Sequence, residues 1–159
     1  SRYTQVPDDS GDVGGRVERE GGGQNVEGKD THGHGKAPKE GIERATRAGI
    51  PRNRLIIDPG IGFFRHRSLP WDEWDLELLR NVDKLRAIKL PLMIGASRKS
   101  FIGKVLEHKG PPEQRLYGSL AIAYHCASQQ VEWVRVHDVG PTRDVVRMAE
   151  LLRGKWGDT

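Results

Sequence analysis

Three short polar segments carry the side chains best suited to chemistry. They read IIDPGIGFF around Asp58, MIGASRKSFIG around Lys99 and WVRVHDV around His137. Each contains an apolar run that predicts a buried strand, and ligands of parallel α/β folds bind beyond the carboxyl ends of such strands. The sequence therefore predicts one site, formed where the three strands end.

The first segment ends its strand at Asp58 and continues into a tight turn shaped by Pro59, Gly60 and Gly62. A carboxylate at this position can accept paired N–H donors from a heterocycle. An aspartate can also cap an Asx-type turn with its own side-chain oxygen. The residues alone leave both interpretations open.

The second segment places Ser97, Arg98 and Lys99 directly after a strand. Arginine offers a planar fork of donors and lysine a compact charge, so this loop suits the binding of an anion or a carbonyl group. A solvated basic loop is the alternative interpretation. The glycine spacing of a Walker phosphate-binding loop is absent before the lysine.

The third segment alternates along its strand. Arg135 and His137 fall on one face, and Val134 and Val136 fall on the other. Two basic groups on a buried strand need an anion nearby, which is either Asp138, another side chain or a ligand phosphate. We favour the ligand.

The elements that position these segments follow from hydrophobic periodicity. It predicts helices over residues 40–48, 75–87 and 114–128 and from Thr142 onward, and strands over residues 55–58, 92–96 and 133–138. One helix followed by three βα units is typical of an α/β fold with a parallel sheet. The buried helix faces are predicted to carry Leu78, Val82 and Leu85; Leu116, Leu120, Ala123, Tyr124 and Ala127; and Val145, Val146, Ala149 and Leu152.

Composition divides the chain. Residues 1–38 are rich in glycine and charge and nearly free of large apolar side chains, which predicts a disordered or irregular segment. A net charge of +4 favours anionic partners. The single cysteine, Cys126, excludes an internal disulfide and is interpreted as a packing residue. No apolar run approaches the roughly 18 residues of a membrane span, so we expect a soluble, cytoplasmic protein without membrane partners.

Four motifs together resemble dihydropteroate synthase. They are DPGIGF at 58–63, SRKSFIG at 97–103, RLYGSLA at 115–121 and RVHDV at 135–139, in this order and with helices between them. The resemblance covers about residues 39–156. It implies that residues 39–159 form the C-terminal portion of a (β/α)8 TIM barrel, with about three βα units and the site at the barrel mouth.

The resemblance also implies a function. Such enzymes of folate biosynthesis condense 6-hydroxymethyl-7,8-dihydropterin diphosphate with p-aminobenzoate, giving 7,8-dihydropteroate and diphosphate. Lys99, Arg135 and His137 match the catalytic positions. The matching binding positions are Asp58 and Lys99 for the pterin, Arg135 and His137 for the diphosphate, and Phe63, Ser97 and Arg98 with Lys99 around p-aminobenzoate.

The resemblance implies a magnesium cofactor, whose ligand is expected in N-terminal strands of the family that this chain does not contain. No metal ligand is predicted within the chain itself. The resemblance further implies a sulfonamide target and is compatible with a homodimer of the full-length parent.

Three alternatives remain open at this point. A methyltetrahydrofolate-using corrinoid methyltransferase is another pterin-binding barrel, but it should lack the SRKSFIG segment. A catalytically incompetent fragment or pseudoenzyme of the same family would fail to make dihydropteroate even when folded. A basic nucleic-acid binder is disfavoured, because the cations stand at strand ends instead of forming a continuous stripe.

Overall fold

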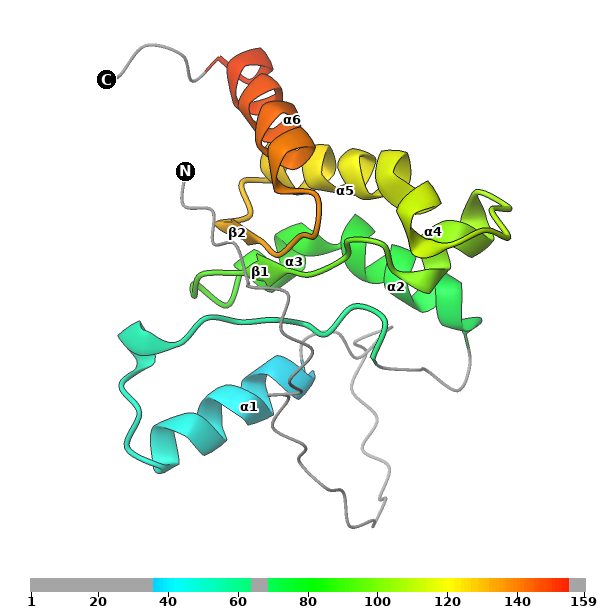
Figure 1. Ribbon diagram of the computed structural model, residues 1–159. Helices are drawn as coiled ribbons and strands as arrows, with labels where there is room; N and C mark the ends of the chain where they lie inside the picture. Colours follow the sequence, from blue (N-terminus) through cyan, green and yellow to red (C-terminus); the bar gives the residue numbers. More distant parts are fainter. Residues whose placement is uncertain (1–35, 64–68, 155–159) are drawn as a thin grey trace.

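The computed structural model describes residues 36–63 and 69–154 (Figure 1). The irregular segment predicted over residues 1–38 lies outside the described residues, apart from its last three positions. Those three positions begin the first helix, α1 (Lys36–Arg47). The division of the chain at residue 38 stays a prediction.

A short parallel sheet lies at the centre of the described chain. β1 (Met93–Ile94) pairs in parallel with β2 (Trp133–Val134). On the other side of β1, Ile57 forms an isolated parallel bridge to Leu92. The predicted mixed α/β class is confirmed, and all three predicted strand regions meet side by side.

The strands are nevertheless shorter than predicted: β1 has two residues where a strand over 92–96 was predicted, and β2 has two where a strand over 133–138 was predicted. Within residues 55–58 the structure records a bridge only at Ile57, whose N–H donates to Pro91 O at 2.9 Å and whose carbonyl accepts from Met93 N at 2.8 Å. Pro59 and Pro91 have no N–H to extend the ladder. The prediction of a strand over 55–58 was therefore wrong in length, although the segment lies where a strand was expected.

The first two helical regions differ from prediction at their ends. α1 covers Lys36–Arg47 instead of residues 40–48, and Gly49 follows it with the expected left-handed φ of 84°. A 3₁₀ turn at Arg52–Arg54 then leads into the Ile57 segment.

The single helix predicted over residues 75–87 is two helices, α2 (Trp71–Arg80) and α3 (Val82–Arg86). The break falls at Asn81, whose side-chain amide donates to Glu77 O at 2.8 Å and to Glu77 Oε1 at 2.7 Å. Asparagine commonly interrupts helices in this way, because its side chain competes for backbone hydrogen bonds. The predicted buried face of Leu78, Val82 and Leu85 is confirmed.

One helix was missed entirely. α4 (Ser100–Val105) begins inside the basic loop and buries Phe101 and Ile102. It is followed by a 3₁₀ turn at Pro112–Arg115 and by α5 (Leu116–Ser128), close to the predicted range of 114–128. Ala123 and Ala127 are buried on α5 as predicted, whereas Tyr124 is exposed.

The last helix, α6 (Val139–Leu152), starts three residues before the predicted cap. Thr142 is not the N-cap but a buried residue of the first turn, and Asp138 occupies the cap position. Val146 and Ala149 are buried as predicted, whereas Leu152 is exposed. No helix among the described residues is long and apolar enough to cross a membrane.

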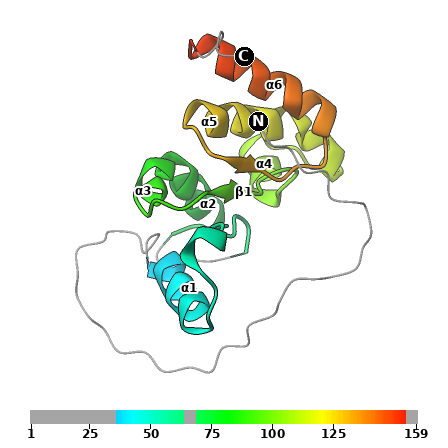
Figure 2. The ribbon, with the colours of Figure 1, turned by 90° about the vertical axis from the view of Figure 1, so that its left-hand side faces the viewer.

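The main core lies between the sheet and helices α2 to α5. Figures 1 and 2 both show α1 at one end of the molecule and the packed pair α5–α6 at the other, with the sheet between them. Cys126 is fully buried, and burial raises the pKa of its thiol to about 12. The interpretation of Cys126 as a packing residue is confirmed.

Leu92 is fully buried and Leu152 is 70% exposed. We therefore expect their truncation to alanine to have very different effects on stability. Leu92→Ala should lower the free energy of unfolding by roughly 2 to 5 kcal/mol, since it removes buried surface and leaves a cavity. Leu152→Ala should change it by less than about 0.5 kcal/mol. Urea unfolding followed by circular dichroism measures both, and equal losses would contradict the core described above.

Candidate functional site

Asp58 follows the bridged segment, and its two carboxylate oxygens have different partners. Oδ1 accepts a hydrogen bond from Gly60 N at 2.8 Å, which closes an Asx turn. Oδ2 accepts one from Arg135 Nη2 at 3.3 Å, across 77 residues of chain. The turn-capping interpretation is thus confirmed for one oxygen, while the other meets a cation from a different segment.

Asp75 supports the same turn from α2, and sequence reasoning missed it. Its carboxylate is 1% exposed, and Oδ1 accepts a hydrogen bond from Gly62 N at 2.8 Å. The sequence did contain a signal: Asp75 precedes Leu78 and Val82 by three and seven residues, so it shares their buried helix face. A carboxylate on such a face requires hydrogen-bond donors.

Lys99 lies against this turn. Its Nζ is 4.0 Å from the centroid of the Phe63 ring, within the range of a cation–π interaction. Gly62 gives it room, because a Cβ at that glycine would come within 3.0 Å of Lys99 Cδ. Gly62 also has a φ of 81°, which favours glycine for a second reason.

The ammonium of Lys99 is held in surroundings that disfavour its charge. Burial lowers its pKa below the ordinary lysine value, and the nearby positive charge of Arg135 lowers that pKa further. The carboxylates of Asp58 and Asp75 act in the opposite direction without cancelling the effect. An anion placed here would favour the charged form of Lys99 and so oppose both of the effects that lower its pKa.

Arg135 reaches Asp58 by lying across Gly95. Its backbone N–H donates to Ile94 O at 3.0 Å, which continues the pairing of β1 with β2. A Cβ at Gly95 would stand 2.5 Å from Arg135 Nη2. The missing side chain of Gly95 therefore makes the space that the guanidinium occupies.

His137 contacts the hydroxyl group of Ser97 in two ways. The His137 N–H donates to Ser97 Oγ at 3.3 Å, and His137 Nδ1 lies 3.1 Å from the same oxygen. The hydroxyl oxygen of Ser97 therefore joins both the backbone and the imidazole ring of His137 to the loop that follows β1.

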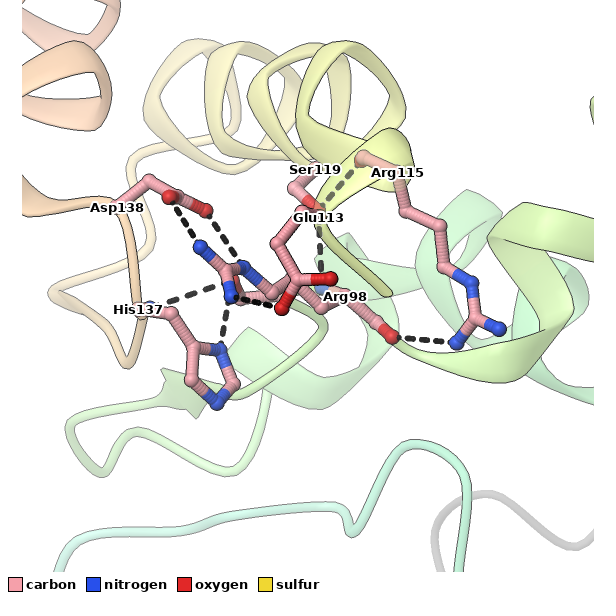
Figure 3. Close-up of polar contacts among 7 residues, drawn as sticks. Arg98, Glu113, Arg115, Ser119, His137 and Asp138 are labelled. Carbon is pink, nitrogen blue, oxygen red and sulfur yellow. Dashed lines mark hydrogen bonds and ion pairs between the residues drawn. The ribbon is translucent and has the colours of Figure 1, made fainter. Parts of the chain in front are cut away.

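Arg98 points towards protein carboxylates. Figure 3 shows its guanidinium between Asp138 and Glu113, with ion-pair distances of 2.6 and 3.1 Å. Asp138, which the sequence offered as a partner of Arg135 or His137, is thus paired with Arg98. The hydrogen bond from Arg98 holds the pKa of the Asp138 carboxyl below its usual range.

The structure therefore brings the predicted residues together in pairs: Asp58 with Arg135, Phe63 with Lys99, and Ser97 with His137. All three pairs lie just beyond the carboxyl ends of the parallel segments. An acceptor, an aromatic ring and three basic side chains at that edge of an α/β protein form an arrangement that is suited to an anionic ligand.

Comparison with known proteins agrees with the α/β class and identifies the family within it. The family model for pterin binding enzymes matches residues 29–137. The chain belongs to the pterin-binding enzyme family. It resembles dihydropteroate synthases in particular: it is 41% identical over 111 residues to the enzyme of Escherichia coli K12 and 35% identical to that of Synechocystis.

Each of these alignments covers 70% of this chain but only 37% and 36% of the two relatives. The chain thus spans little more than a third of their length. Solved structures agree. The dihydropteroate synthase of Yersinia pestis matches with a TM-score of 0.65 at 38% identity, covering 72% of this chain and 51% of that one.

A second match is the Coxiella burnetii dihydropteroate synthase in complex with pteroic acid. Its TM-score is 0.65 at 37% identity, with 75% of this chain and 42% of that one covered. The Xanthomonas albilineans dihydropteroate synthase with 4-aminobenzoic acid has a TM-score of 0.66 at 34% identity, with 73% and 40% covered.

Lys99→Met is expected to raise the thermal stability of the unliganded protein at about pH 7. Folding lowers the pKa of Lys99, which means that the folded state binds the lysine proton less well than the unfolded state does. The charged lysine therefore costs the folded state stability, and this penalty is complete at any pH below the folded pKa. The penalty disappears as the pH rises to the unfolded value, so the gain should shrink towards about pH 10. Calorimetry across this range tests the expectation, and a constant loss of stability would refute it.

Gly95→Ala should displace Arg135 with little effect on folding, because the colliding atom ends a flexible side chain. We expect weaker binding of inorganic diphosphate by isothermal titration calorimetry and a change in unfolding free energy below about 1 kcal/mol. Gly140→Ala is the matched control, since a Cβ at Gly140 meets nothing within 4 Å. Unchanged diphosphate affinity in the Gly95 variant would contradict this placement of Arg135.

Proposed function

We propose that this chain is part of a dihydropteroate synthase, the transferase that joins 6-hydroxymethyl-7,8-dihydropterin diphosphate to p-aminobenzoate. One observation carries the proposal: Asp58 faces Arg135, and Lys99 lies beside both. A hydrogen-bond acceptor for a pterin ring and cations for its diphosphate thus occur side by side. Two of the solved relatives support the proposal through their ligands: one binds pteroic acid, which is chemically related to the product, and the other binds 4-aminobenzoic acid, the acid form of the second substrate.

The fold that accompanies this proposal is the C-terminal portion of a (β/α)8 barrel. The parallel order of the Ile57 segment, β1 and β2, each followed by helices, supports it. The proposal also includes a homodimer of the full-length parent and a cytoplasmic location.

In the proposed reaction, the amine nitrogen of p-aminobenzoate attacks the methylene carbon attached to the pterin ring. A C–N bond forms, the C–O bond to the diphosphate breaks with its electron pair, and the nitrogen loses a proton. Negative charge therefore grows on the leaving diphosphate. Arg135 and His137 would stabilise that charge, and fixed cations do this at little reorganisation cost.

Asp58 and Lys99 have the complementary task of orientation. Asp58 would accept hydrogen bonds from N–H groups of the pterin with Oδ2, the outer oxygen that now faces Arg135. Lys99 would contact the ring from the side of Phe63. Holding the methylene carbon near the amine converts an encounter into an intramolecular step. Phe63 and Ser97 would border the p-aminobenzoate pocket. Arg98, predicted with them, has its guanidinium in ion pairs instead.

Magnesium belongs to the proposal only through residues outside this chain. Within residues 36–63 and 69–154, no three histidine, cysteine, aspartate or glutamate side chains are grouped so that they could hold a metal ion. We assign no step of the reaction to a metal.

Thermal unfolding with and without the pterin diphosphate tests the proposal. A ligand that binds only the folded state raises its stability by RT ln(1 + [L]/Kd), so the unfolding temperature should increase with ligand concentration. An unfolding temperature that does not change with ligand concentration would overturn the proposal for this chain. Adding p-aminobenzoate and measuring dihydropteroate then separates a working enzyme from an incompetent fragment that still binds pterin.

Arg135→Ala should weaken binding of the pterin diphosphate at least about tenfold, since a hydrogen bond to a charged group contributes roughly 1.5 to 3 kcal/mol. Arg143→Ala removes the same charge from the exposed surface of α6, where Arg143 pairs with its neighbour Asp144, and should have little effect. Equal losses in both variants would show that net charge alone is responsible, contrary to the proposed role of Arg135.

A further inference from the structure

The loops that follow β1 and β2 are joined by side chains that continue the register of the strands. Ile94 lies opposite Val134 in the parallel pair. The next side-chain contacts, Ser97 with His137 and Arg98 with Asp138, join residues that are again 40 positions apart. Two neighbouring residues on one loop thus hold two neighbouring residues on the other.

The side chain of Arg98 is fully engaged in this contact. Its Nε donates to Asp138 Oδ2 at 3.1 Å and its Nη2 to Asp138 Oδ1 at 2.6 Å, which is a bidentate pair. Its Nη1 donates to Glu113 Oε1 at 3.1 Å. The side chains of Arg98 and Asp138 are 24% and 19% exposed, so the pair is largely withdrawn from water.

The backbone of Arg98 is fixed as well. Its N–H donates to Ser119 Oγ at 2.9 Å, and its carbonyl accepts from Arg115 Nη1 at 2.9 Å (Figure 3). Its φ of 56° lies in the left-handed region, which is uncommon for arginine. A residue keeps such a conformation when its surroundings impose it. Here the surroundings act on both the side chain and the peptide groups.

We infer that Arg98 is a positioning residue, which fixes the loop between Ser97 and Lys99 against the loop of His137 instead of binding substrate itself. This inference rests on the proposed function, because Lys99 and His137 are the groups assigned to pterin and diphosphate. It replaces the role at p-aminobenzoate that the sequence predicted. Asp138 is its counterpart on the second loop.

The two roles of Arg98 predict opposite effects of Asp138→Asn. If Arg98 bound an anionic ligand, neutralising Asp138 would release its guanidinium and leave affinity unchanged or increase it. If Arg98 is a positioning residue, Asp138→Asn breaks the same ion pair that Arg98→Ala breaks, so both variants should bind the anion more weakly. Inorganic diphosphate, titrated calorimetrically into the full chain, is the probe that separates these cases.

We expect Arg98→Ala and Asp138→Asn to weaken diphosphate binding by similar factors, about tenfold each for a lost charge-assisted hydrogen bond. The double variant should be no weaker than either single variant, because both remove the same interaction. The exchanged variant Arg98→Asp with Asp138→Arg should recover part of the affinity. Tighter binding in Asp138→Asn, or losses that multiply in the double variant, would overturn the inference.

A second measurement does not depend on any ligand. The His137 N–H donates to Ser97 Oγ, so its hydrogen-exchange rate reports whether the two loops remain joined. Arg98→Ala and Asp138→Asn should accelerate exchange at His137 while leaving amides in the middle of α5 protected. Arg143→Ala serves as the control for loss of charge. Unchanged exchange at His137 in both variants would overturn the inference whatever the binding data show.

Together, the binding and exchange measurements distinguish a failure of the positioning role from a failure of the proposed function. If the unaltered chain does not bind diphosphate while exchange at His137 responds as expected, the proposed function fails and the positioning role stands. If the unaltered chain binds diphosphate and the Arg98 and Asp138 variants bind it equally well, the positioning role fails and the proposed function stands.

Discussion

The parallel register between β1 and β2 is the constraint on which the rest of the site depends. Backbone pairing continues only as far as the hydrogen bond from Arg135 N to Ile94 O. Beyond that point the chains separate into loops, and side chains take over at the same spacing of 40 residues. A slip of one residue in the sheet would turn every side chain to the opposite face and break both contacts at once.

The site is shaped by what glycine leaves out as much as by its polar groups. Gly95 and Gly62 provide the space for Arg135 and Lys99, two cations that repel each other. Partial burial of Lys99 and the nearby charge of Arg135 both lower the pKa of the lysine. Such stored destabilisation commonly marks functional positions, because a ligand of opposite charge relieves it.

The sequence was most informative where strands end. Polar residues after apolar runs located the loops of Asp58, Lys99 and His137, because parallel strands carry their carboxyl ends to a common edge. The strand over residues 55–58 was overestimated, because the apolar pattern does not take into account that Pro59 and Pro91 cannot donate to the ladder. The missed helix α4 has only six residues, too few to show a helical period.

Two features of the site required the third dimension. The position of Asp75 on a buried helix face indicates that it needs a donor, but only the fold shows that this donor is Gly62, which lies 13 residues earlier. Arg98 and Lys99 are neighbours of similar chemistry, yet one faces Asp138 and the other faces Phe63. Which of two adjacent cations faces the ligand side depends on backbone geometry, here a positive φ at Arg98 that no sequence pattern specifies.

The ion pair between Arg135 and Asp58 couples the two parts of the proposed site, the pterin side at Asp58 and the diphosphate side at Arg135. Its side chains are 46% and 35% exposed and its distance is 3.3 Å, so the pair is weak and easily exchanged. A ring system that takes the outer oxygen of Asp58 releases the guanidinium for a second, anionic group. By linkage, an anion that draws Arg135 away equally frees Asp58. A single molecule carrying both groups satisfies each half, whereas either half of that molecule alone leaves one charge without its resting partner.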